Sequence, residues 1–84
     1  MTFSIKIEAS ALKQLGAIDK PYRLLIIDQI DALAIDPFRG KQLKGQWKSL
    51  RRIRVGSYRV IYSVKTDILV VLIVQIGHRK DVYG

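Results

Sequence analysis

The chain contains no cysteine, one histidine and one tryptophan. Without cysteine there can be no disulfide, thiolate metal site or cysteine nucleophile, so the fold depends on packing alone. The longest apolar stretch, residues 68–76, has nine residues and is too short to span a bilayer. The first ten residues lack the apolar segment of a signal peptide. We therefore expect a single domain, residues 1–84, in the cytoplasm and without membrane contact.

Acidic residues are scarce in the second part of the chain. Residues 1–36 hold four basic and five acidic side chains, whereas residues 37–84 hold eleven basic and two acidic ones. No acidic residue stands between Pro37 and Thr66. Such a concentration of charge repels itself, so it predicts a polyanionic partner: nucleic acid, an acidic membrane surface or an acidic protein. The chain has no pair of acids at ligand spacing, and we expect no metal and no cofactor.

The apolar pattern predicts an N-terminal strand, two helices and three further strands. Residues 3–8 alternate apolar and polar side chains, as in a half-buried strand. A helix over 11–15 ends at Gly16, and a second helix begins at Asp19 and Pro21 and ends before Asp36. Residues 38–48 have no periodicity and are predicted as a loop. Strands follow at 50–55, 58–65 and 68–76, joined by two-residue turns at Gly56-Ser57 and Thr66-Asp67.

This order, β-α-α-β-β-β, predicts an α+β fold. The N-terminal strand and the helical hairpin are expected to pack on an antiparallel meander sheet. The apolar stripe of the second helix, which we expect to be buried, consists of Tyr22, Leu25/Ile26, Ile30 and Leu33.

Three arginines are predicted to gather on one face of the sheet. A two-residue turn at Gly56-Ser57 would pair Arg54 with Arg59, and strand alternation would place Arg52 on the same face. Like charges directly opposite each other destabilise a strand pair, and such a conflict with a local rule is where a functional site is expected. The alternative interpretation is a solvated strand face on a basic protein.

The chemistry of this face favours binding and polarising a phosphate. Arginine does not lose its proton at working pH, but its paired N–H groups hold phosphate and stabilise developing negative charge. His78 and Tyr83 are the titratable candidates near the C-terminus, with Arg79 between them. Each could instead have a packing role. These residues suit metal-free RNA cleavage, in which the substrate's own 2′-hydroxyl attacks the neighbouring phosphate.

The run LRRIRVGSYRVIYSV, followed by an apolar strand and IGHRKDVY, resembles the RelE/ParE superfamily of toxins from type II toxin–antitoxin systems. The resemblance implies the fold predicted above. RelE-type members cut mRNA on the ribosome, whereas ParE-type members inhibit DNA gyrase. The resemblance places the catalytic set of the RelE type on Arg52, Arg54, Arg59, Arg79 and Tyr83.

By this resemblance, Tyr83 would be the general base, Arg79 would lie at the leaving oxygen and the other three arginines would hold the scissile phosphate. His78 is the alternative acid or base. Trp47 could stack on a base, although one tryptophan in a small chain is more often a packing residue. The residues expected to contact RNA are Arg39, Lys41, Lys44, Lys48 and Arg51.

The resulting hypothesis is a ribosome-dependent, metal-independent mRNA endonuclease that inhibits translation. Its partners would be mRNA in the ribosome and a RelB-like antitoxin, whose acidic helical segment would complete a hetero-oligomer. Two alternatives stay open: a ParE-like inhibitor of DNA gyrase, and a basic RNA-binding module without activity.

Overall fold

The computed structural model describes residues 2–78, and its elements are the following. A strand and two helices come first: β1 (Ser4–Ile7), α1 (Ala9–Gly16) and α2 (Lys20–Ala32). A two-residue strand β2 (Lys41–Gln42) and a 3₁₀ turn η1 (Gly45–Trp47) come next. Three longer strands complete the described chain: β3 (Arg51–Val55), β4 (Tyr58–Lys65) and β5 (Val70–His78).

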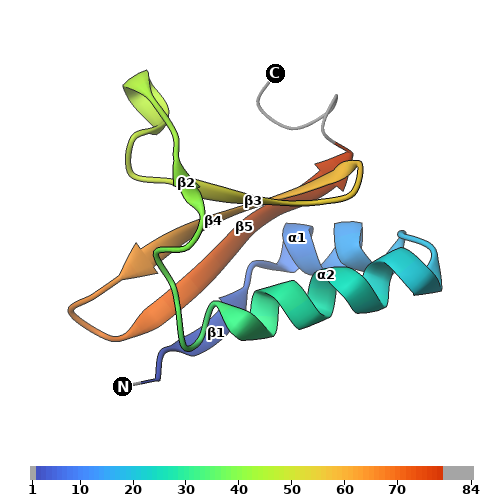
Figure 1. Ribbon diagram of the computed structural model, residues 1–84, viewed down its shortest axis with the longest axis horizontal. Helices are drawn as coiled ribbons and strands as arrows, with labels where there is room; N and C mark the ends of the chain where they lie inside the picture. The colour runs from blue at the N-terminus through green and yellow to red at the C-terminus, as the bar shows by residue number, and fades with distance from the viewer. Residues whose placement is uncertain (1, 79–84) are drawn as a thin grey trace.

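The strands form one five-stranded mixed sheet in the order β1-β5-β4-β3-β2. β1 runs parallel to β5, and the other neighbours are antiparallel. Both helices lie on one side of the sheet (Figure 1). No helix within residues 2–78 has the length and apolarity needed to cross a membrane.

The predicted α+β fold with a helical hairpin on a sheet is confirmed, but the sheet is larger than the predicted meander. The meander consists of β3, β4 and β5, to which β1 adds a parallel edge strand and β2 adds a short antiparallel one. β2 has only two residues, so it carries no alternation that a sequence pattern could reveal.

The predicted two-residue turn at Thr66-Asp67 is wrong. Lys65 pairs with Val70, so the loop between β4 and β5 contains four residues. Leu69, the last residue of this loop, adopts a positive φ of 54°. Glycine and asparagine usually signal this conformation in a sequence, whereas leucine does not, so the longer loop is not recognisable from the sequence. As a result β5 begins two residues later than predicted and extends to His78.

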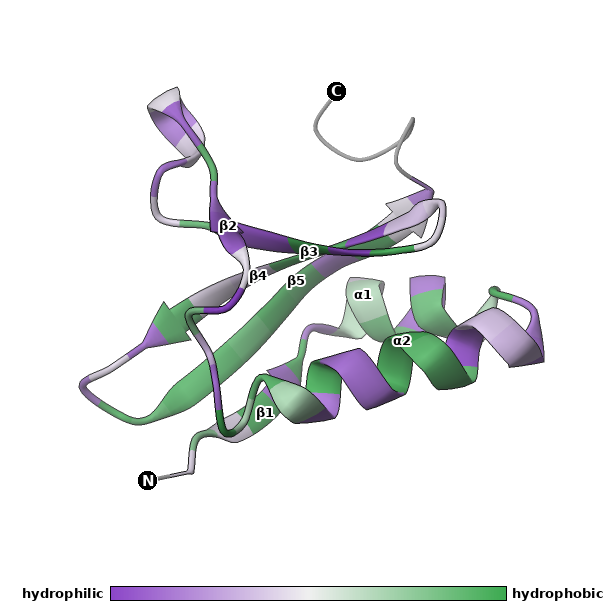
Figure 2. Ribbon diagram, viewed as in Figure 1, coloured by the Kyte–Doolittle hydropathy of each residue, from purple (hydrophilic) through white to green (hydrophobic). Residues whose placement is uncertain are grey.

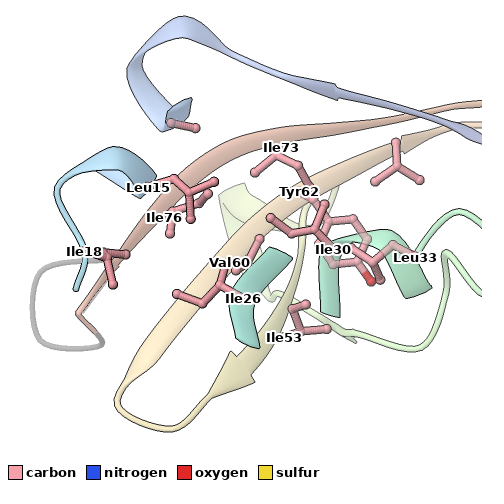
Figure 3. Close-up of a cluster of buried hydrophobic side chains, with 12 residues drawn as sticks. Leu15, Ile18, Ile26, Ile30, Leu33, Ile53, Val60, Tyr62, Ile73 and Ile76 are labelled. Atoms are coloured by element: carbon pink, nitrogen blue, oxygen red, sulfur yellow. The ribbon is translucent and has the colours of Figure 1, made fainter. Parts of the chain in front are cut away.

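The hydrophobic core lies between the helices and the sheet (Figure 3). Ile26 and Ile30 of α2 are almost completely buried, and they belong to the same cluster as Val60 and Ile73 of the sheet. Figure 2 shows that β5 is hydrophobic along most of its length, whereas β2 is hydrophilic. The expected stripe of α2 is confirmed for Ile26, Ile30 and Leu33, but Tyr22 and Leu25 are about half exposed.

Two neighbouring residues of α2 provide a test of this packing. Ile26 is 0% exposed and Leu25 is 53% exposed. Truncating a buried isoleucine removes its transfer free energy and leaves a cavity, so Ile26→Ala should lower the free energy of unfolding by about 2–5 kcal/mol. Leu25→Ala, the matched control, should lower it by less than about 1 kcal/mol. Urea unfolding measures both changes, and equal losses would contradict the orientation of α2.

Candidate functional site

The register of β3 and β4 is set by the turn at Gly56-Ser57. Val55 pairs with Tyr58 across this turn, and Gly56 has a φ of 59°, which glycine adopts without steric cost. From this pair the ladder places Arg54 opposite Arg59. The cross-strand pairing predicted from the sequence is therefore confirmed.

The three arginines lie on the sheet face that points away from the helices. Ile53 and Val60, which alternate with them along β3 and β4, belong to the core on the helix side. The register of β2 adds Lys41 to this face, because Lys41 pairs with Arg52. We call the set Lys41, Arg52, Arg54 and Arg59 the arginine face.

Two uncharged side chains that the sequence did not single out also belong to this face. Arg52 pairs with Ile61, and Ile61 pairs with Gln75 of β5. Ile61 is 1% exposed, although α1 and α2 both lie on the other side of the sheet (Figure 1). It forms an apolar floor on which the stems of long cationic side chains can rest.

Two side chains of the arginine face are available to an anion. Arg54 is exposed and Arg52 is partly buried, and neither side chain makes a hydrogen bond or ion pair with any residue in the range 2–78. A cleft of about 320 Å³ opens beside β3, where β2 ends, and Gln29 of α2 forms part of its wall. The other lining residues are Arg39, Gly40, Lys41, Arg52, Ile53 and Arg54.

The face has cations but no proton acceptor among residues 2–78. Its strand positions in that range carry no Asp, Glu, His or Tyr. The same range also lacks any group of three His, Asp or Glu side chains that could hold a metal ion. The described face can bind a phosphate and stabilise negative charge on it, and a proton-transfer group would come from elsewhere.

Tyr62 anchors the loop that carries Arg39 to the cleft. Tyr62 is fully buried; its hydroxyl donates a hydrogen bond to the carbonyl of Pro37 (2.8 Å) and accepts one from the backbone N–H of Gly40 (3.0 Å). A Cβ at position 40 would overlap the Tyr62 hydroxyl and lie 2.7 Å from the carbonyl oxygen of Arg52, so only glycine fits. Burial raises the pKa of the Tyr62 hydroxyl above its ordinary value, because the phenolate would lose its hydration.

Arg51 supports the same loop from the helix side of β3. Its Nη1 donates hydrogen bonds to the carbonyls of Gly40 (2.7 Å) and Phe38 (3.3 Å), and its guanidinium lies 5.0 Å from the centre of the Phe38 ring. These contacts hold Arg51 in place as a support for the loop. It does not share a face with Arg52 and Arg54, and its predicted contact with RNA stays a prediction.

The structure does not bring His78 to the arginine face. His78 pairs with Tyr58 and lies edge-on to its ring, with centroids 5.9 Å apart, and Tyr58 packs against the core on the helix side. A bulge opposite Ile61 and Tyr62 inserts one extra residue in β5, which reverses the alternation of every later side chain. Without it, His78 would face the arginines.

The remaining predicted site residues divide into two groups. Lys44 and Lys48 are exposed beside η1, and Trp47 is 38% exposed in the same segment. Arg79 and Tyr83 lie outside the described residues, and their predicted roles stay predictions.

Comparison with known proteins places the chain in a family. A family model for the ParE toxin of the type II toxin–antitoxin system parDE matches residues 5–83. No curated protein sequence gives a match. The chain belongs to the RelE/ParE superfamily of type II toxin–antitoxin toxins.

Solved structures of RelE-type toxins have the same fold. The archaeal RelE–RelB complex from Pyrococcus horikoshii matches with 30% identity and a TM-score of 0.80, covering 96% of this chain and 99% of that one. The RelBE2 toxin–antitoxin complex from Mycobacterium tuberculosis matches with 21% identity and a TM-score of 0.87, covering 94% and 100%. A mutant of the free Escherichia coli toxin RelE matches with 20% identity and a TM-score of 0.84, covering 98% and 88%.

Removing the Tyr62 hydroxyl should destabilise the fold. Tyr62→Phe leaves a buried N–H and a buried carbonyl without their partner, which costs about 1–3 kcal/mol of unfolding free energy. Tyr58→Phe is the matched control, because the Tyr58 hydroxyl makes no hydrogen bond with residues 2–78. Urea unfolding at neutral pH measures both, and a Tyr62→Phe protein as stable as Tyr58→Phe would refute the anchor.

The same pair of variants tests the raised pKa of Tyr62. A raised pKa in the folded state contributes stability that is complete below the unfolded value of about 10 and is lost as pH rises through the folded value. The stability advantage of the wild type over Tyr62→Phe should therefore shrink above pH ~10. Thermal unfolding between pH 8 and pH 11 checks this, and an advantage that stays constant would contradict it.

Proposed function

We propose that this toxin is an mRNA endonuclease that cuts RNA within the ribosome without a metal ion. The proposal rests on one observation above all: Arg54 stands directly opposite Arg59, beside Arg52 and Lys41, on a face turned away from the core. Like charges directly opposite each other oppose strand pairing, whereas the same arrangement suits the binding of a phosphodiester. The 30% identity to the Pyrococcus horikoshii RelE supports the RelE type, for which the sequence resemblance implies this activity.

The reaction follows from the chemistry of RNA. The 2′-oxygen attacks the adjacent phosphorus, a P–O2′ bond forms, and the P–O5′ bond breaks, which leaves a 2′,3′-cyclic phosphate and a 5′-hydroxyl. A base takes the proton of the 2′-hydroxyl, and the departing 5′-oxygen receives one. In this proposal Tyr83 is the base and Arg79 lies at the leaving oxygen. Arg52, Arg54 and Arg59 bind the non-bridging oxygens and stabilise the pentacovalent charge.

In the cell, an antitoxin would inhibit this activity. The Mycobacterium tuberculosis and Pyrococcus horikoshii relatives were crystallised as toxin–antitoxin complexes. An acidic, RelB-like helical segment would neutralise the basic half of this chain in a cytoplasmic hetero-oligomer. The segment would compete with RNA for the arginine face.

Inhibition of DNA gyrase is the second candidate function. The observation that favours it is the match of residues 5–83 to the ParE family model. A gyrase inhibitor performs no phosphodiester chemistry, so the convergence of arginines on one face would have no catalytic purpose. A supercoiling assay with purified gyrase separates the two candidates.

Arg59→Ala should slow RNA cleavage by about 10²–10³-fold, as expected for loss of one preorganised donor to the transition state. The matched control is Lys65→Ala. Lys65 is exposed on the same face of the same strand, six residues and about 20 Å from Arg59, and its removal should leave the rate within about twofold. Primer extension on mRNA in a reconstituted translation reaction measures both rates.

A further variant, Arg54→Ala, tests whether slow cleavage could result from misfolding. Arg54 is exposed, and its removal relieves a like-charge pair, so this variant should fold as well as the wild type and still cleave slowly. Equal activity of all three variants and the wild type would overturn the assignment of the arginine face. Intact mRNA together with inhibited supercoiling would establish the gyrase function instead.

A further inference from the structure

Residues 42–50, which we call the basic arm, form a projection that is closed by its own hydrogen bonds. The backbone N–H of Leu43 donates to the carbonyl of Leu50 (3.0 Å), and the N–H of Leu50 donates to the carbonyl of Trp47 (2.9 Å). The side chain of Gln42 closes the base of the arm through a 2.7 Å hydrogen bond to the carbonyl of Lys48. In Figure 1 the arm extends beyond the sheet, with both helices on the other side.

The arm lies outside the hydrophobic core cluster. None of its residues is fully buried, Leu43 and Leu50 are partly buried, and Trp47 is 38% exposed. Ordering a backbone costs about 1–2 kcal/mol per residue, and apolar burial is the usual compensation. Because no residue of the arm is fully buried and its two lysines are exposed, the arm has side chains available for a role outside the core.

The exposed side chains of the arm suit RNA. Lys44 and Lys48 flank η1, and neither makes an ion pair with residues 2–78. Trp47 lies between them and is 38% exposed. Ammonium groups bind phosphates without reading sequence, and an aromatic face stacks on any unpaired base.

A second cleft joins the arm to the arginine face. It has a volume of about 260 Å³, and Lys41 and Arg52 of the arginine face form one part of its wall. Leu43 and Lys44 of the arm form another part. Three cationic side chains, Lys41, Arg52 and Lys44, therefore line one cleft between the arginine face and η1.

We propose that the basic arm is a subsite for single-stranded RNA, holding nucleotides that flank the one bound on the arginine face. Lys44 and Lys48 bind their phosphates, and the exposed part of the Trp47 ring contacts one of their bases. This inference depends on the proposed function only for the direction in which the RNA strand runs. The binding of RNA to the arm does not depend on it. The arm supplies affinity, and the arginine face supplies the chemistry.

The fluorescence of Trp47 reports binding at the arm directly, because it is the chain's one tryptophan. The probe is a 12-nucleotide, 2′-O-methylated RNA, which cannot be cleaved through its 2′-oxygen. It should quench Trp47 emission with an affinity that falls steeply with salt. Lys44→Ala/Lys48→Ala should weaken binding at least tenfold and reduce the slope of log K against log salt by about 1.4, as expected for two lost phosphate contacts.

The matched control is Lys13→Ala/Lys20→Ala, which removes two exposed lysines from the helical hairpin and therefore the same net charge. It should change the affinity by less than about threefold. Equal losses in both double variants would show that net charge alone drives binding, and unchanged Trp47 emission would show that RNA avoids the arm. Either result overturns the proposal.

Cleavage in translating ribosomes separates this inference from the proposed function. The Lys44→Ala/Lys48→Ala protein should need at least fivefold more ribosomes for half-maximal cleavage and reach the wild-type rate at saturation. A lower saturated rate with unchanged half-saturation would contradict a binding role for the arm. If RNA quenches Trp47 but no mRNA is cut, the endonuclease proposal fails and the RNA subsite stands.

Discussion

The turn at Gly56-Ser57 is the constraint on which the site depends. Because it contains two residues, Val55 must pair with Tyr58 and Arg54 must pair with Arg59. One residue more or less would turn the side chains of one strand to the opposite face and separate the three arginines. The glycine that accepts a positive φ at this turn therefore determines where the protein concentrates its charge.

The fold sustains this charge because the opposite face of the same strands is well packed. Ile53 and Val60 lie in the core beneath the arginines, and Tyr62 ties β4 to the loop that brings Arg39 and Lys41 alongside. Along these two strands, residues that pack in the core therefore alternate with the residues that we propose bind an anion. A change at the exposed side chain of Arg54 should therefore alter function with little effect on the core.

Local patterns predicted the arginine face, whereas features without a local pattern were missed. The pairing of Arg54 with Arg59 follows from the length of the turn and from strand alternation. Both can be read from β3 and β4, which have five and eight residues. The position of His78 depends on a bulge in β5, and β5 is apolar on both faces, so no alternation reveals where an extra residue enters. The addition of Lys41 to the face depends on β2, which is too short to leave a pattern.

The most direct test of the central claim is to remove the nucleophile that the account assigns to the substrate. A translated mRNA carrying a single 2′-deoxynucleotide immediately 5′ of a mapped cut would be treated with the toxin and read by primer extension. If the 2′-hydroxyl is the nucleophile, this cut should disappear while cuts elsewhere in the same mRNA remain. Undiminished cleavage at the deoxynucleotide would contradict attack by the 2′-hydroxyl, and with it the role proposed for the arginine face.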